Sequence, residues 1–111
     1  MDAALKAIAE PRRRAILRLV WDAERSAGDI ASHFEVSRPA ISQHLSILRT
    51  AGLVTERRDG ARRLYRADRD ALQELQASLQ AFWIGSLATL KEEVESDERR
   101  RRGRGRVHRQ R

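Results

Sequence analysis

The stretch VSRPAISQHLSILRTAGLV, residues 36–54, decides the fold of this chain. Ser37 is a residue type that caps the start of a helix, and Pro39 suits the first helical turn because no N–H is needed there. Gly52 supplies the left-handed conformation that commonly ends a helix. Between them, apolar side chains recur at the spacing of one helical face: Ile41, Leu45 and Leu48. The stretch therefore predicts a short helix with one face fixed to a core.

The opposite face of this reading helix carries small polar and basic side chains in place of the Glu and Lys that are usual on a solvated surface. These residues are Ser42, Gln43, Ser46 and Arg49. Hydroxyl, amide and guanidinium groups are the ones that read the edges of base pairs. This face therefore predicts contact with DNA, and an ordinary amphipathic surface helix is the alternative interpretation.

A second short helix is expected just before the reading helix. Ser26 followed by Asp29 resembles a capping box and predicts a helix that runs to about Phe34. A tight turn then leads to the reading helix. Two short helices joined by a turn, the second with a polar outer face, are the helix-turn-helix pattern.

A hairpin is expected after the reading helix. Residues 53–58 and 62–67 read as strands, separated by the strong tight-turn signal Asp59-Gly60-Ala61. The hairpin carries five arginines: Arg57, Arg58, Arg62, Arg63 and Arg66. This pattern predicts a wing that contacts phosphates. Charge that merely protects an exposed hairpin edge from strand pairing is the alternative.

Further helices are expected over residues 2–10, 11–22 and 68–97. The last one has an apolar stripe longer than so small a domain needs for its own core, and buried aromatic residues dominate interfaces. We therefore predict a homodimer built on the terminal helices, with packing of the aromatic residues inside their own subunit as the alternative. The predicted dimer contacts are Leu5, Ile8, Leu79, Phe82, Trp83, Leu87 and Leu90.

The composition narrows the class of protein. A chain of 111 residues suits one domain, and the absence of cysteine excludes disulfides and thiolate metal sites. No signal-peptide core is recognisable, and the longest nearly apolar run, residues 81–90, is about half of what spans a bilayer. We expect a soluble, cytoplasmic protein without a membrane partner. No phosphate-binding glycine loop, metal-binding histidine pair or nucleophile constellation is present, so no enzyme is expected.

The net charge of +7 belongs to the C-terminal end. Residues 99–111 hold eight arginines and no acid, which leaves 15 basic and 16 acidic residues, a net of −1, for residues 1–98. Dense like charge predicts a disordered tail over 99–111 that follows a DNA-binding and dimerisation domain over 1–98. Because such a tail binds phosphates without sequence preference, a DNA-compacting or architectural protein is the alternative function. The uncharged polar groups of the reading helix favour a sequence-specific regulator.

Residues 3–95 resemble the ArsR/SmtB family of small winged helix-turn-helix repressors. The resemblance is carried by AIAEPRRRAILRLV, by the reading helix and by AGLVTERRDGARRLYRA. It implies a mainly α fold with a β-hairpin wing (α+β). It also implies a homodimer that binds an imperfect palindrome in double-stranded DNA near a promoter and usually represses it. The predicted DNA contacts are Ser37, Arg38, Pro39, Ser42, Gln43, Ser46, Arg49, Arg57, Arg62 and Arg63.

The metal sites known in this family are not intact in the sequence. Ser26 and Gly28 stand where metal sensors carry a Cys-x-Cys pair, and the imidazoles expected in the last helix are missing. Imidazole and carboxylate groups would still suit nickel or zinc, and the weak candidates are His33 and His108. His44 is expected to pack or to meet DNA. No cofactor is required for DNA binding. The sequence does not identify the effector, and a divalent metal such as nickel, sensed directly or through a partner protein, is one alternative.

Overall fold

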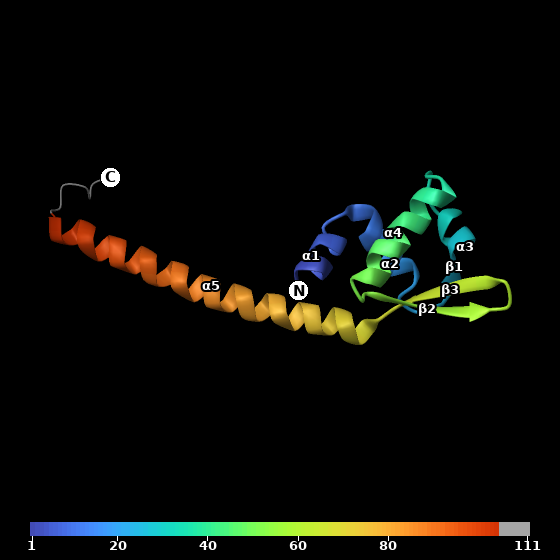
Figure 1. Ribbon diagram of the computed structural model, residues 1–111. Helices are drawn as coiled ribbons and strands as arrows, with labels where there is room; N and C mark the ends of the chain where they lie inside the picture. Colours follow the sequence, from blue (N-terminus) through green and yellow to red (C-terminus); the bar gives the residue numbers. More distant parts are fainter. Residues whose placement is uncertain (105–111) are drawn as a thin grey trace. The chain divides into compact units, whose positions relative to one another are not determined.

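The computed structural model describes residues 1–104, which divide into two compact units, Met1–Gln76 and a second that begins at Ala77. The last helix, α5, starts in the first unit, and its remainder forms the second (Figure 1). The elements are α1 (Asp2–Ile8), α2 (Pro11–Leu19), β1 (Arg25–Ser26), α3 (Ala27–Ala31), α4 (Arg38–Thr50), β2 (Val54–Asp59), β3 (Arg62–Ala67) and α5 (Arg69–Arg104). This mainly helical chain with a small antiparallel sheet confirms the expected winged helix-turn-helix class.

The reading helix α4 begins where the sequence predicted. The Ser37 hydroxyl accepts the backbone N–H of Ala40 at 3.2 Å, and Pro39 lies in the first turn. The cap gives an acceptor to a backbone N–H that has no partner within the helix. Proline lacks an N–H, but in the first turn no helical hydrogen bond is lost by this.

The reading helix also ends as predicted. Gly52 has φ of +79°, and the N–H of Leu53 reaches back to the carbonyl of Leu48 at 2.9 Å. A second bond of 2.9 Å joins the Gly52 N–H to the Arg49 carbonyl. This pair of bonds is the Schellman motif, which needs a left-handed residue and so favours glycine.

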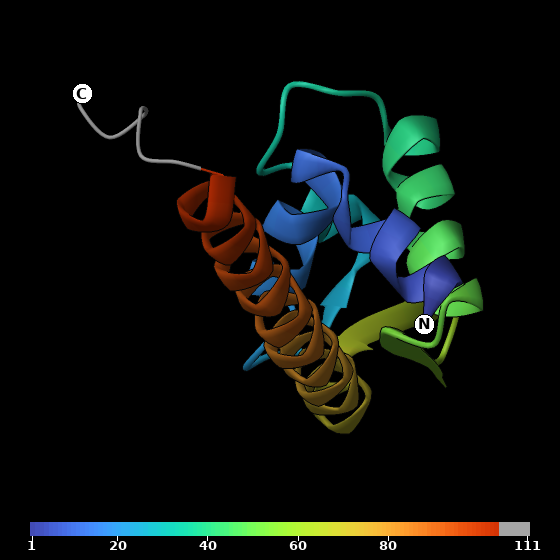
Figure 2. The same ribbon diagram turned by 90° about the vertical axis from the view of Figure 1, so that its left-hand side faces the viewer.

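One apolar core lies inside the first unit. The stripe of α4 reaches it as expected, because Ile41, Leu45 and Leu48 are at most 1% exposed. The helices α1 and α2 lie against α4 (Figures 1 and 2). The buried residues of this core are Ala7, Ile16, Leu17, Val20, Ile30, Ile41, Leu45, Leu48, Leu53, Val54 and Ala67.

The wing, which we define as β2, β3 and their turn, forms the predicted hairpin with small shifts. Gly60 has φ of +65° and forms a two-residue turn with Ala61, so Asp59 belongs to β2 and not to the turn. The sequence missed β1, which pairs with β3 to give the order β1-β3-β2. A two-residue strand is too short to show the alternation on which a strand prediction rests.

The first three helices are shorter than expected. Glu10, expected inside the first helix, instead caps α2 by accepting backbone N–H groups of its first turn. The expected extension of α2 to residue 22 is wrong, because the Val20 carbonyl accepts the N–H of Ala67 at 2.9 Å and joins the chain to the sheet. The helix α3 ends at Ala31, before the expected Phe34.

The helix α5 is longer than expected. Residues 99–104, which were expected to begin a disordered tail, continue the helix α5. Asp97 forms ion pairs with Arg100 and Arg101 at helical spacings, and such pairs stabilise a helix. Residues 105–111 lie outside the described part of the chain. None of the helices in residues 1–104 is both long and apolar enough to cross a membrane.

Candidate nucleic-acid interface

The outward face of α4 brings together the predicted base-contacting side chains. All of them are exposed: Arg38, Pro39, Ser42, Gln43, Ser46 and Arg49. Ser37 is exposed too, but its hydroxyl oxygen already accepts the capping N–H of Ala40. The structure therefore leaves the hydroxyls and the amide of this face free of the core, which occupies the opposite side of the helix.

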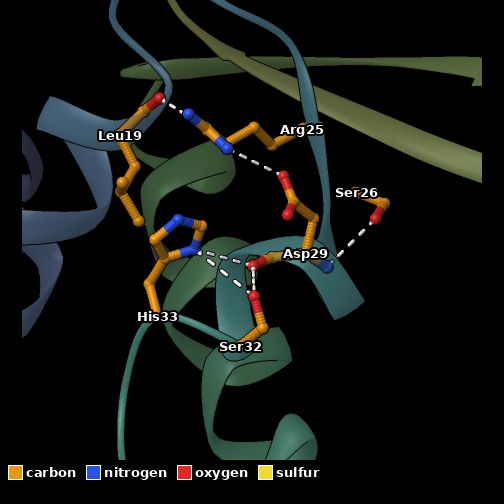
Figure 3. A network of polar contacts seen from close by, with 6 residues as sticks. All are labelled: Leu19, Arg25, Ser26, Asp29, Ser32 and His33. Carbon is orange, nitrogen blue, oxygen red and sulfur yellow. Dashed lines mark hydrogen bonds and ion pairs between the residues drawn. The ribbon is translucent and has the colours of Figure 1, made fainter.

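The helix α3 is held in place by a small polar network (Figure 3). The guanidinium of Arg25 donates to the Leu19 carbonyl at 3.0 Å and to the Asp29 carboxylate at 2.9 Å. The Ser26 hydroxyl accepts the N–H of Asp29 at 3.1 Å, as the capping prediction required. In a capping box the Asp29 carboxylate would accept the backbone N–H of Ser26. Here it forms an ion pair with Arg25 instead. This network fixes the first helix of the helix-turn-helix to the end of α2.

A cleft of about 520 Å³ separates the start of α4 from the wing. Its lining includes the hydroxyls and guanidinium groups of Ser26, Arg38, Ser42, Arg62, Arg63 and Tyr65. The Arg38 side chain lies along α3, since a Cβ placed on Gly28 would be 3.6 Å from its Cζ. Hydroxyl and guanidinium groups are the usual partners of DNA phosphates, so this cleft has the chemistry of a backbone-binding site.

Three of the five arginines of the wing are exposed and have acidic partners in the described residues: Arg57, Arg62 and Arg63. Arg57 binds both carboxylate oxygens of Glu24 at 2.8 Å, and Arg62 lies 3.3 Å from Asp59. The Arg57 hydrogen bond holds the pKa of Glu24 below its ordinary value of 4.5. The sequence does not reveal this role of Glu24, because the carboxylate and its arginine are 33 residues apart and no local pattern joins them.

Glu56 is a second acidic partner of these arginines that no local pattern in the sequence reveals. Its two carboxylate oxygens each lie 3.3 Å from an arginine, Arg49 of α4 and Arg63 of β3. Both arginines are predicted DNA contacts, so the charge of the interface is partly neutralised within the protein itself.

His44 packs beside α2. Its ring is partly buried, and its Nδ1 lies 3.4 Å from the guanidinium of Arg13. Burial lowers the pKa of His44 below its ordinary value, against the opposing attraction of Glu10. The packing alternative for His44 is therefore the one that the structure favours.

The histidine candidates for a metal find little support in the described residues. The Nδ1 of His33 lies 2.9 Å from the backbone carbonyl of Asp29 (Figure 3). No group of three or more His, Asp or Glu side chains suited to a metal ion occurs within the described part of the chain. His108 lies outside that part.

The predicted dimer contacts differ in exposure. In the second unit Phe82, Trp83, Leu87 and Leu90 are 55–57% exposed, and Leu79 is half-buried. The rings of Phe82 and Trp83 meet edge to face with centroids 5.9 Å apart. Near the N-terminus Leu5 is half-buried, whereas Ile8 packs against the core of its own subunit. An apolar face of α5 is therefore available for a partner.

A helix-turn-helix with a polar reading helix and an arginine-bearing wing defines the class of winged helix-turn-helix DNA-binding proteins. Residues 10–56 match the family model described as bacterial regulatory protein, arsR family. The chain is also 38% identical over 96 residues to the HTH-type transcriptional regulator Rv2034 of Mycobacterium tuberculosis, a match that covers 86% of this chain and 90% of that one. The chain belongs to the ArsR family of transcriptional regulators.

Other relatives agree with this assignment. The transcriptional repressor SdpR of Bacillus subtilis is 42% identical over 74 residues, which cover 67% of this chain and 82% of SdpR. A crystal structure described as a possible transcriptional regulator for arsenical resistance superposes with a TM-score of 0.69 and 43% identity, covering 84% of this chain and 96% of that one. A homodimeric winged helix-turn-helix domain, Mb0332 of Mycobacterium bovis, gives a TM-score of 0.62 and 34% identity, with coverages of 72% and 74%. These relatives are regulators and not enzymes, and they lend no support to the architectural alternative.

Proposed function

We propose that this chain is a homodimeric regulator that recognises an imperfect palindrome in double-stranded DNA and represses the promoter beside it. The observation that carries the proposal is the exposed polar face of α4 beside an arginine-bearing wing. In such proteins the reading helix enters the major groove, and a dimer spaces two of them about 34 Å apart along the DNA. Repression is supported by the relative SdpR, whose name describes it as a repressor.

Gln43 and Ser42 read bases, whereas Arg62 binds the backbone. A Gln amide has one donor and one acceptor that match the edge of adenine, and Gln43 projects from the exposed side of α4. Arg62 lies at the wing tip and lines the cleft beside the start of α4, where its guanidinium binds a phosphate, a contact that carries no sequence information.

The second subunit covers the apolar face of α5. Phe82, Trp83, Leu87 and Leu90 expose large apolar areas in the second unit, and the homodimeric description of Mb0332 supports this assembly. Sedimentation of the wild-type protein and of Leu87→Asp tests it. We expect a dimer for the wild type and a monomer for the variant, and a monomeric wild type at micromolar concentration would reject the dimer.

The central experiment is enrichment of bound sequences from a random duplex pool, followed by footprinting of the enriched site. We expect a protected palindrome with two half-sites. Gln43→Ala should then cost roughly 1–3 kcal/mol on this site and relax the preference at one position of each half-site. Arg62→Ala should weaken binding to all duplexes about equally.

The matched control is Gln73→Ala, which removes an exposed amide from α5 and not from α4. It should leave both affinity and preference unchanged. Absence of any enriched sequence at moderate salt would refute the regulator proposal, and equal weakening of all sequences by Gln43→Ala would refute the role of that residue.

The effector is not identified by the sequence or the fold, and the candidate to test is a divalent metal such as nickel or zinc, sensed directly or through a partner protein. Binding to the enriched site is to be measured with and without nickel, zinc and cobalt. A metal-dependent change in affinity for the purified protein would support direct sensing, and indifference to every metal would reject it.

A further inference from the structure

The carboxylate of Glu56 holds an arginine of the reading helix and an arginine of the wing at the same time. Its Oε1 lies 3.3 Å from Nε of Arg49 in α4, and its Oε2 lies 3.3 Å from Nε of Arg63 in β3. The Glu56 side chain is only 18% exposed, whereas each of the two arginine side chains is 54% exposed. The acidic group is therefore the covered centre of a three-residue bridge with two exposed arms.

This bridge differs from the other ion pairs of the wing. Arg62 and Asp59 are neighbours across the turn, and Arg57 joins β2 to the segment that precedes β1. Among the ion pairs of the described residues, only the pair of Glu56 with Arg49 connects α4 with the wing.

The strand register explains why Glu56 reaches Arg63. Glu56 faces Tyr65 across the hairpin, and Arg63 lies two residues before Tyr65 in β3, on the same face. Diagonal neighbours of this kind lie within reach of long side chains. Arg63 and Tyr65 also line the cleft between α4 and the wing, so the bridge lies beside the predicted phosphate site.

The bridge has a consequence for binding to DNA. Arginines that neutralise phosphates supply most of the sequence-independent affinity of a DNA-binding protein. A carboxylate shared by Arg49 and Arg63 cancels part of that charge, and it also fixes the position of the wing relative to the reading helix. A duplex that does not fit this arrangement must draw the arginines away from Glu56 before it can use them.

We propose that Glu56 is a specificity-determining residue that weakens binding to non-operator DNA by holding Arg49 and Arg63 in one arrangement. The proposal rests on the proposed function, since it presupposes an operator that fits this arrangement. In the operator complex both ion pairs of Glu56 remain, so binding to the operator carries no cost for breaking them. In non-specific complexes the bridge has to open, which lowers their affinity.

The test compares Glu56→Gln with the wild type on the enriched operator and on a random duplex over a range of salt concentrations. Glutamine has nearly the same shape but cannot neutralise the two guanidinium groups. We expect affinity for random DNA to rise about threefold to tenfold, as for the loss of one or two exposed ion pairs. The salt dependence on random DNA should steepen by about one released counterion or more. Operator affinity should change by less than about twofold, so the specificity ratio should fall.

The matched control is Glu24→Gln, which removes one acidic partner from a wing arginine, Arg57, by the same change of charge but leaves the link to α4 intact. It should raise the affinity for both duplexes together and keep their ratio. The melting temperature of each variant shows whether it is folded. An inactive fraction of protein lowers both apparent affinities by the same factor and therefore does not change their ratio. An unchanged ratio in Glu56→Gln, or the same change of ratio in both variants, would overturn the role of Glu56 while leaving the regulator intact. A wild-type protein with no preferred sequence would overturn both proposals.

Discussion

Arg13 is predicted to be the side chain that fastens α1 to the rest of the first unit. Its Nε donates to the Ala7 carbonyl at 2.6 Å, and its Nη2 donates to the Lys6 carbonyl at 3.1 Å. Both carbonyls lie in the last turn of α1, where a helix has fewer donors than acceptors. The Lys6 carbonyl also accepts the N–H of Ala9 at 3.3 Å. A seven-residue helix is not stable alone, so its order depends on such tertiary contacts.

The perturbation is Arg13→Met, which keeps an apolar stem of similar length and removes both charged hydrogen bonds. A hydrogen bond to a charged group contributes about 1.5–3 kcal/mol when shielded from water, and less when exposed. The bond to Ala7 is partly buried and the bond to Lys6 is exposed. We therefore expect the free energy of unfolding to fall by about 2–3 kcal/mol and the melting temperature by about 10 °C or more.

The assay is urea unfolding followed by circular dichroism, at one fixed protein concentration because dimerisation stabilises the folded state. Arg14→Met is the matched control, since Arg14 makes one exposed hydrogen bond, to the Ile8 carbonyl at 2.7 Å. It should cost less than about 1 kcal/mol. An effect of Arg13→Met below about 0.5 kcal/mol, or no larger than that of Arg14→Met, would refute the reasoning.

Three further predictions concern the core, the helix end and pH. Leu45→Ala should lower the free energy of unfolding by about 2–5 kcal/mol, because this side chain is 1% exposed, whereas Ser46→Ala on the outer face should stay within about 0.5 kcal/mol; urea unfolding of both distinguishes them. Gly52→Ala should cost about 1 kcal/mol in the same assay, since a φ of +79° strains any residue with a Cβ, and no loss would contradict that account. The lowered pKa of His44 means that the unfolded state takes up its proton first, so stability should be constant above the ordinary histidine pKa of about 6.5 and decline as pH falls through it. Unfolding measured between pH 5 and 8, about one and a half units either side of that value, should show a shallower decline in His44→Gln, and an identical decline would reject the assignment to His44.

Much of the reading helix was determined by the sequence itself. Its cap at Ser37, its proline in the first turn and its left-handed end at Gly52 depend on interactions between residues a few positions apart. The apolar stripe of α4 was equally predictable from the sequence, because helical geometry alone decides which residues share a face. The hairpin followed from the same kind of local information, with its turn at Gly60.

The tertiary structure decided the parts that join distant segments. The strand β1 forms only because Arg25 and Ser26 pair with β3. Two residues are too few to show the alternation of apolar and polar side chains that predicts a strand.

The same holds for the charges of the interface. The sequence showed arginines on the wing and the reading helix, but not that Glu24 and Glu56 neutralise them. Electrostatic interactions depend on distance in space and on exposure to water, and neither is written in the order of residues. The sequence therefore determined which groups the protein offers to DNA, and the folded chain decided how many of their charges are already paired before DNA arrives.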